Sequence, residues 1–545
     1  MLSGFNPYQI QDEKVRECII RLMNLIEELR QENQTLREEN QRLRDENNRL
    51  KGEQGKPDIK ASKTPRKTDI SSEKERRQEK KWHKVSKKDK IKIDREEVLT
   101  VDQSCLPEDA QFKGYEDTVV QDILIKTDNV CFRKEKYYSE SESKCYTATL
   151  PAGYNGQFGP GVRSLIITFY YASGMTEPKI VEFFQHIGIF ISEGQVSNIL
   201  TKKHECWHKE KDEIFLAGIS STSWQHIDDT ATRVDGKNEH CHIVCNPLYT
   251  FYSTRARKDR LTVIAVLQNT RQLCFLFNNE TIMWFKQFSV PKWAQREIEK
   301  WPKEEILSQQ SVFELLERDL LTLNDQQRAR VLEAGALTFY HNQKDVPVVC
   351  ELISDDAPQF RYVTEQQGLC WVHEGRPYKK LSPLLEYHEE LLSDFREDFW
   401  DFYKQLQHYK TAPSEEKSIA LDKEFDKLFN TETKYTSLDN QIKKTLDKKE
   451  ELLLVLRNPE VPLHNNPAEL GARQRVRKRD VSFGPRTDEG TNAWDTFMTI
   501  VETAKKLGVS FYSYIYARIS GKNDFVSLAE LIQQRTMCRA FGAVG

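Results

Sequence analysis

Hydrophobic positions near the N-terminus recur every seven residues, the spacing of a coiled coil. Leucine fills one heptad position, and the position four residues later holds mostly Asn: Leu22, Leu29, Leu36, Leu43 and Leu50, then Ile26, Asn33, Asn40 and Asn47. Acidic and basic residues flank this stripe at the five-residue g to e′ spacing of a parallel pair: Glu32, Glu39 and Glu46, then Arg37, Arg44 and Lys51. Residues 1–52 therefore predict a dimerisation helix that forms a homodimer or higher oligomer through residues 19–51, with an isolated helix as the alternative.

The heptad pattern stops at Gly52, Gly55 and Pro57. From residue 51 to residue 95 the chain has 17 Lys or Arg and 8 Asp or Glu. Residues 53–96 thus predict a basic flexible linker, which could meet DNA or serve only as a solvated tether. Short β-rich runs follow, and they predict a small β-rich domain over residues 97–165.

Two short amphipathic patterns lie on either side of Gly188, in "EPKIVEFFQHIGIFISEGQVSNILTKK". The second begins with Ser192-x-x-Gln195, a capping-box spacing. Residues 166–215 therefore predict a helical, helix-turn-helix-like DNA-binding region. Two packed helices that do not bind DNA are the alternative, since such pairs are widespread.

Composition narrows the class of protein. A chain of 545 residues is long enough for several domains, and no run approaches the roughly 20 apolar residues of a membrane helix. The N-terminus lacks the basic and apolar regions of a secretory signal, and 11 scattered cysteines fit a reducing compartment. We expect a soluble cytoplasmic protein with no membrane partner.

Three acidic residues follow patterns that suit metal chemistry. Alternation in "STSWQHIDDTATRV" predicts a strand in which Trp224, His226 and Asp228 share one face and Asp229 points to the other. The apolar run before Asp355 predicts a buried strand that ends at this carboxylate.

The third acid, Glu469, falls in the first turn of a helix for which Asn466 is the expected N-cap. Converging carboxylates could hold two Mg²⁺ ions for in-line phosphoryl transfer, with Mn²⁺ as a substitute. Ordinary turns and helix caps explain each acid equally well when it is taken alone.

Five ordered motifs strengthen the metal interpretation. "HIDDTATRV", "LISDDAPQF", "LCWVH", "NNPAELGAR" and "VETAKKLGVSFYSYI" resemble the "HADET", "VSDGY", "CWAH", "NNxAERxxR" and "ETAKxNGVxPYxYL" segments of bacterial DDE transposases of the insertion-sequence-sixty-six group. The resemblance is collinear over most of residues 160–520.

The resemblance implies a multidomain α/β chain with an RNase H-like mixed-sheet catalytic core. This core would span residues 216–520, with a helical insertion at about 382–457 where the family usually has one, and a C-terminal tail at 521–545. Asp228, Asp355 and Glu469 would be catalytic metal ligands in a transposase that cleaves and joins DNA strands. Its partners would be the element's ends and target DNA, with accessory proteins from the same element, in a nucleoid-associated bacterial setting.

Further site residues follow from their positions beside these motifs. The basic run after Glu469 would contact DNA phosphates: Arg473, Arg475, Arg477, Lys478 and Arg479. A structural or DNA-positioning role is assigned to Cys370, His373, Asn465 and Asn466.

This chain departs from the family pattern in three places. The spacing of 127 residues (355 − 228) between Asp228 and Asp355 is longer than expected, and the excess indicates a helical insertion within the core at about 275–343. The family often carries a CxxC zinc module, but Cys105, Cys131 and Cys145 are too widely spaced, so no zinc is predicted. Leu470 stands where the family has Arg after the glutamate. Two other functions remain open: a non-catalytic DNA-binding or regulatory protein derived from a mobile element, and a metal-dependent nuclease that does not join strands.

Overall fold

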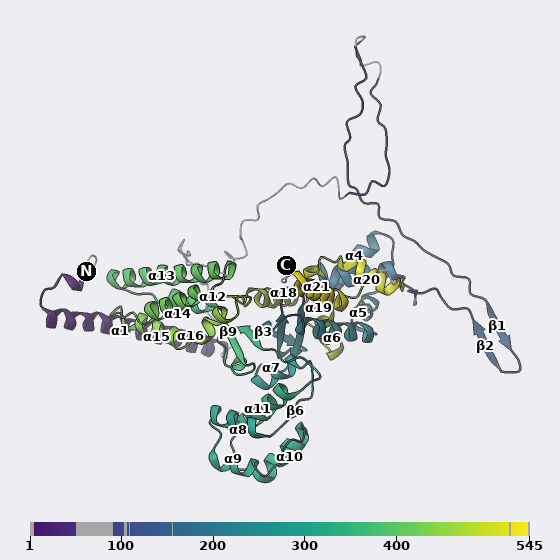
Figure 1. Ribbon diagram of the computed structural model, residues 1–545. Helices are drawn as coiled ribbons and strands as arrows, with labels where there is room; N and C mark the ends of the chain where they lie inside the picture. Colours follow the sequence, from purple (N-terminus) through teal and green to yellow (C-terminus); the bar gives the residue numbers. More distant parts are fainter. Residues whose placement is uncertain are drawn as a thin grey trace.

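A five-stranded mixed sheet lies at the centre of the molecule (Figure 1). The computed structural model describes residues 5–50, 91–102, 106–107, 110–154, 156–522 and 525–542. The strands are β3 (Trp224–Val234), β4 (Lys237–Cys245), β5 (Thr250–Arg255), β8 (Glu351–Ser354) and β9 (Gln366–Leu369). Their spatial order is β5-β4-β3-β8-β9; the first three are antiparallel, and β8 and β9 run parallel to β3. The predicted mixed α/β class is confirmed.

The turn between β3 and β4 is a two-residue Asp-Gly connection. Asp235 and Gly236 both have positive φ, 48° and 75°, as a hairpin turn that matches the twist of its strands requires. This tight turn fixes the β3–β4 register, in which Asp228 faces Ile243.

Helices gather at the β5 side of the sheet (Figure 1). They are α3 (Pro160–Ile167), a π-helical turn (Thr168–Ala172), α4 (Glu177–His186), α5 (Glu193–Thr201), α6 (Glu205–Ile219), α19 (Asp488–Lys506), α20 (Phe511–Ser520) and α21 (Leu528–Gly542). Two other helices lie against the sheet elsewhere: α7 (Arg260–Leu267) contacts β4, and α18 (Asn466–Ser482) contacts β3 and β4. Side chains of α19 accept hydrogen bonds from alternate backbone amides of β5, in the pairs Thr250–Thr503, Tyr252–Thr499 and Thr254–Asp495, at 3.2, 3.1 and 2.6 Å. This edge of the sheet is therefore covered.

The helices α4 and α5 are the pair expected around Gly188, which has a φ of 81°. The Ser192 side chain accepts a hydrogen bond from the Gln195 amide at 3.3 Å, half of the predicted capping box. The existence of these two helices is confirmed, and DNA binding by them stays a prediction.

The chain makes a long helical excursion between β5 and β8. It contains α8 (Asn279–Gln287), α9 (Lys292–Ile298), α10 (Gln309–Asp319), α11 (Asp325–Asn342) and the short pair β6 (Cys274–Phe275) and β7 (Leu307–Ser308). Figure 1 shows this group below the sheet. Its apolar residues continue the main core; for example, Phe277 and Leu337 are almost fully buried.

A second helical group separates β9 from α18 and has a core of its own. It consists of α12 (Trp371–Lys380), α13 (Glu386–Thr411), α14 (Glu415–Phe429), α15 (Thr436–Leu446), α16 (Lys449–Leu452) and α17 (Leu454–Arg457). Aromatic rings pack around the buried Trp371, whose ring centroid lies 5.4 Å from that of Phe399. The group lies on the opposite side of the sheet from α19 and α20 (Figure 1).

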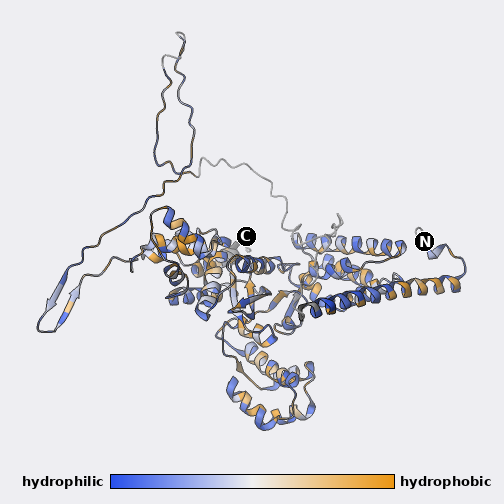
Figure 2. Cartoon of the chain, turned by 180° about the vertical axis from the view of Figure 1, so that it is seen from behind, coloured by the Kyte–Doolittle hydropathy of each residue, from blue (hydrophilic) through white to orange (hydrophobic). Residues whose placement is uncertain are grey.

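The N-terminal helix α1 (Glu13–Leu50) packs along this second helical group. Glu27 is 6% exposed and accepts hydrogen bonds from the Leu384 and Leu385 amides at the start of α13, at 2.7 and 3.0 Å. Asn24 bonds in the same way to the Thr436 amide at the start of α15, at 3.0 Å. Figure 2 shows hydrophobic residues recurring along this otherwise hydrophilic helix.

Residues 97–165 differ from the small β-rich domain that was expected. The described part of this range has a hairpin of β1 (Lys136–Ser139) and β2 (Lys144–Thr147) and the start of α3, and the described residues between 91 and 135 form neither helix nor strand. Large apolar side chains of this run are exposed, including Leu124 at 90%. β-prone residues need partner strands and a buried face to form a sheet. Among the described residues of this range only the hairpin strands are paired, and nearly all of their residues are exposed.

The predicted basic linker and the absence of a membrane helix can be compared with the described residues only in part. The basic linker lies outside the described residues from 53 to 90, and Cys105 does as well. Among the helices of the described chain, none is both long and apolar enough to cross a membrane.

Candidate active site

Parallel pairing of β3 with β8 brings Asp228 and Asp355 to the same end of the sheet. His226 pairs with Ile353, so the same register carried two residues further sets Asp228 level with Asp355. Neighbouring strands lie about 4.8 Å apart, and directly paired residues project to the same face. The two acids predicted from separate strand patterns thus meet at the carboxyl ends of adjacent parallel strands.

Asn465 fastens the start of α18, the helix that carries Glu469, to β3. Its Oδ1 accepts a hydrogen bond from His226 Nδ1 at 3.0 Å, and its Nδ2 donates to the Ile227 carbonyl at 2.7 Å. These bonds assign the imidazole proton to Nδ1, and burial lowers the pKa of His226 to about 3, so the ring is neutral. Glu469 therefore enters from α18 beside the strand that carries Asp228.

The N-cap of α18 differs by one residue from the prediction. Asn465 is the N-cap, and Asn466 is the first helical residue, followed by Pro467. The Asn465 side chain makes no capping bond because it is committed to β3, which sequence spacing could not reveal. Glu469 still lies in the first turn, as expected.

Gly471 lets α18 approach the sheet closely. A Cβ at this position would lie 2.8 Å from Ile243 Cγ2 on β4, closer than any real contact. The Gly471 carbonyl also accepts a hydrogen bond from the buried Tyr252 hydroxyl at 3.1 Å. Gly471 thus determines how closely α18, which carries Glu469, approaches the sheet.

The surroundings of Asp228 favour a bound cation. The pKa of Asp228 is raised to about 7, first by burial and then by the nearby charges of Asp355, Asp229 and Glu469, against a hydrogen bond from the Asp229 amide. The pKa of Asp355 is also raised, first by burial, while His373 and the Ala357 amide oppose the shift. Carboxylates crowded in this way repel one another until a positive charge joins them, so the all-oxygen set suits Mg²⁺.

The two adjacent acids, Asp229 and Asp356, are held by other partners. Asp229 accepts a hydrogen bond from Gln359 Nε2 at 2.8 Å, and Lys258 lies 3.7 Å away. Asp356 pairs with Lys448 at 2.8 Å and with Arg361. Burial raises the pKa of Asp356, but the bonds from these two cations more than offset it, so the pKa lies below its ordinary value.

Cys370 and His373 lie beside Glu469. One ligand atom from each of the three residues falls within 4.8 Å of the others, a set that could hold a metal ion. However, burial raises the pKa of the Cys370 thiol to about 12, and its sulfur accepts a hydrogen bond from the Asn465 amide at 3.2 Å. This hydrogen bond ties Cys370 to the start of α18, in keeping with the structural role predicted for it.

Two arginines and a histidine surround the Glu469 carboxylate. His373 Nδ1 and Arg376 each lie 3.5 Å from Oε1, and Arg473 lies 3.8 Å from Oε2. Arg376 was not among the predicted site residues; its place three residues after His373, one helical turn on, is the signal that could have identified it.

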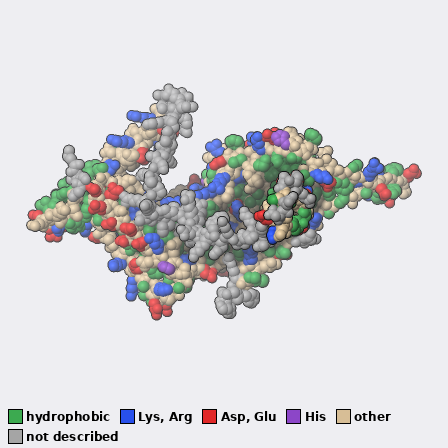
Figure 3. All heavy atoms as spheres, turned by 90° about the horizontal axis from the view of Figure 1, so that it is seen from above, with side chains coloured by type: hydrophobic (Ala, Val, Ile, Leu, Met, Phe, Trp, Pro, Cys, Tyr) green, Lys and Arg blue, Asp and Glu red, His purple; other side chains and the backbone are tan. Residues whose placement is uncertain are grey.

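The basic run of α18 divides into exposed and buried residues. Arg473 and Arg477 are exposed, and Arg479 is partly so while it bonds to the Ala231 carbonyl. Seen from above, Lys and Arg side chains gather near the middle of the visible face (Figure 3). The exposed arginines of α18 are free to approach a phosphate backbone from solvent.

Arg475 and Lys478 correct the prediction that the whole run contacts DNA. Arg475 is fully buried, paired with Asp495 at 3.2 Å and stacked over Trp494. Lys478 is 6% exposed and donates to the Tyr170 carbonyl at 2.6 Å. Three residues apart, both lie on the face of α18 that packs inward, so their role is structural.

Comparison with known proteins identifies one matching family. Residues 357–493 match the family described as Transposase IS66 family, which covers Cys370, His373 and Glu469. An uncharacterized protein, y4jO, of Sinorhizobium fredii is 29% identical over 303 residues, which is 56% of this chain and 94% of that protein.

Proposed function

We propose that this chain, whose residues 357–493 form a domain of the transposase IS66 family, cleaves and joins DNA strands with Asp228, Asp355 and Glu469 as metal ligands. The observation that carries the proposal is the raised pKa of Asp228, caused by burial and by Asp355, Asp229 and Glu469 around it. The charges of Asp355 and Glu469 both act on Asp228, which supports a shared site for divalent cations between β3, β8 and α18.

An RNase H-like identity for the core is part of the proposal. Three antiparallel strands followed by two parallel ones, with acids on the central strand and its parallel neighbour, support it. The two helical groups would then be insertions at about 275–343 and 382–457, within a core of residues 216–520.

The side chains have distinct tasks in this scheme. Asp228, Asp355 and Glu469 would hold two Mg²⁺ ions, which when bound activate the attacking oxygen and stabilise the leaving oxygen of phosphoryl transfer. His226 and Asn465 keep α18 against β3 and so hold Glu469 near Asp228. Arg473, Arg477 and Arg479 would position the DNA backbone along α18.

Assembly through α1 belongs to the same proposal. The heptad leucines Leu22, Leu29, Leu36 and Leu43 are 50–53% exposed, on a helix whose Met23 and Glu27 are buried against its own chain. An exposed leucine stripe suits a second copy of the helix in a parallel coiled coil.

The test is strand cleavage and joining on a DNA fragment that carries the element's own flanking ends. We expect products with Mg²⁺, none with EDTA, and none from Glu469→Gln, while this variant still binds the fragment. Cleavage without joined products would indicate a nuclease. Binding by the wild type with no product, when accessory proteins from the element are supplied, would indicate a regulatory DNA-binding protein.

A further inference from the structure

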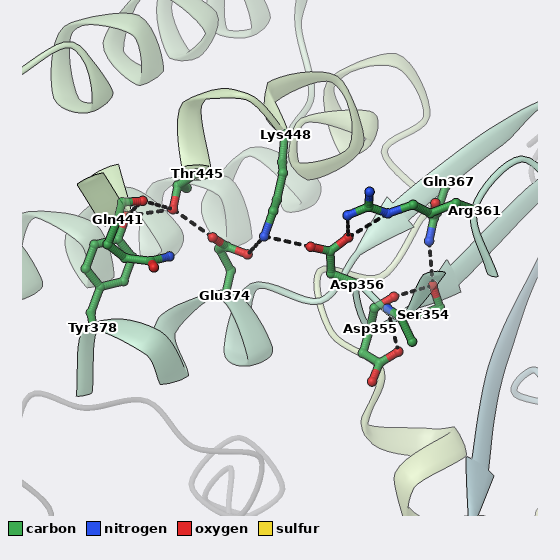
Figure 4. Close-up of polar contacts among 11 residues, drawn as sticks. Ser354, Asp355, Asp356, Arg361, Gln367, Glu374, Tyr378, Gln441, Thr445 and Lys448 are labelled. Carbon is green, nitrogen blue, oxygen red and sulfur yellow. Dashed lines mark hydrogen bonds and ion pairs between the residues drawn. The ribbon is translucent and has the colours of Figure 1, made fainter. Parts of the chain in front are cut away.

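Asp356, directly after the candidate ligand Asp355, is anchored by a lysine from the second helical group. Lys448 Nζ lies 2.8 Å from Asp356 Oδ2, and Arg361 holds the other oxygen (Figure 4). Lys448 lies in the junction between α15 and α16, so the bond joins that group to the end of β8.

The same ammonium also holds Glu374 on α12. Its Nζ lies 2.8 Å from Glu374 Oε2. Glu374 is 5% exposed, and its other oxygen accepts a hydrogen bond from Thr445 at 2.7 Å, which in turn lies 2.6 Å from the Tyr378 hydroxyl. Figure 4 shows these contacts as one continuous chain from Tyr378 to Arg361.

Each end of this bridge is the sequence neighbour of a residue at the candidate site. Asp356 follows Asp355, and Glu374 follows His373, which lies 3.5 Å from Glu469. A single side chain therefore fixes the backbone beside one carboxylate and the helix beside another.

We propose that Lys448 is a positioning residue, which sets the spacing of the Asp355 and Glu469 sides of the metal site from the second helical group. The inference rests on the proposed function and extends it, because it gives that helical group a part in the reaction. Partners that orient metal ligands commonly contribute about 10- to 100-fold in metal affinity or activity.

Three variants separate positioning from simple folding. Lys448→Met removes the bridge, and Lys448→Arg keeps its charge. The double variant Lys448→Met with Glu374→Gln also removes the bridge. Because Glu374 then has no charge, no buried carboxylate is left unpaired, so the double variant replaces Lys448→Met in the test if that single variant fails to fold. The matched control is Lys449→Met, because Lys449 pairs with Asp422 and Asp426 at 3.0 and 2.7 Å within the helical group.

The measurement is the rate of strand cleavage across a Mg²⁺ titration. We expect Lys448→Met, or the double variant, to raise the Mg²⁺ midpoint or lower the rate by about 10- to 100-fold, with partial recovery in Lys448→Arg and wild-type behaviour in Lys449→Met. Wild-type midpoint and rate in folded Lys448→Met or in the double variant would overturn the inference and leave the proposed function standing. Absence of Mg²⁺-dependent cleavage by the wild type would overturn both.

Discussion

Asp228 and Asp229 are adjacent acids whose surroundings differ. Asp229 is held by Gln359 and Lys258, whereas Asp228 is crowded by Asp355 and Glu469. We expect Asp228→Asn and Asp355→Asn to lower strand cleavage by about 10²-fold or more, and Asp229→Asn to retain more activity than either. Cleavage assays at saturating Mg²⁺ measure this ranking, and the reverse order would exchange the assignment of the two aspartates.

Lys478 provides a test of the buried side of α18. The pKa of Lys478 is lowered to about 7, mainly by burial and also by Arg475, against the opposing effect of Glu177. Between about pH 7 and 10.5 the unfolded chain binds a proton at this lysine and the folded protein does not, so folding stability rises with pH by at most about 1.4 kcal/mol per unit.

The free energy of unfolding of Lys478→Met, measured from pH 6 to pH 10, should lack this rise. The stability of the variant relative to the wild type should therefore fall as the pH increases. The control variant is Lys505→Met, because Lys505 is exposed and pairs with Glu502 at 3.2 Å. The difference in stability between this variant and the wild type should not change with pH. A constant difference for Lys478→Met as well would show that Lys478 is charged in the folded protein.

Sequence reasoning predicted the candidate acids better than the basic run. Strand alternation and the resemblance selected Asp228 and Asp355, each of which lies two residues beyond the paired His226 and Ile353 of the parallel strands β3 and β8. Helical spacing could have separated Arg475 and Lys478 from Arg473 and Arg477, but α18 has no apolar stripe to mark which face is buried. The sequence alone could not identify Lys448 as a partner of the site, because only tertiary packing brings it to Asp356.

Among the helices and strands, α18 depends on Gly471 for its close approach to the sheet. A methyl at Gly471 would press on Ile243, so we expect Gly471→Ala to displace the helix, cost about 1–3 kcal/mol of stability and reduce cleavage. Gly194→Ala on α5 is the matched control: its Cβ would meet nothing within 4 Å, so it should gain up to about 1 kcal/mol. Chemical unfolding and cleavage rates measure both, and equal gains would show that α18 tolerates the methyl group.

Elements with strong periodicity were predictable, and those that depend on a distant partner were not. The helices around Gly188 were expected, since their amphipathic faces are local properties. The run before β1 has β-prone residues, yet its described part forms no strand there. The two helical groups were expected as insertions into the core, but the separate core of the second was not.

At the scale of the whole molecule, α1 has one face that packs against its own chain and another that is exposed. Glu27 and Asn24 cap α13 and α15, while the leucine stripe is exposed. We expect Leu29→Asp with Leu36→Asp to shift the protein from dimer to monomer without lowering the stability of the protomer, because these side chains are half-exposed within one chain. Sedimentation and thermal unfolding measure the two effects.

The control for this prediction is Asn24→Ala, which should loosen the contact with α15 and leave the dimer intact. A dimer that survives both leucine substitutions would place the subunit contact outside α1.

The wide separation of the three acids along the chain also affects when activity can appear during synthesis. Asp228 leaves the ribosome 241 positions (469 − 228) before Glu469. At about 5–20 residues per second, this interval lasts about 12 to 48 s. A nascent or prematurely terminated chain that ends before α18 lacks one carboxylate of the site. Incomplete translation products of this protein are therefore expected to leave the host's DNA uncut.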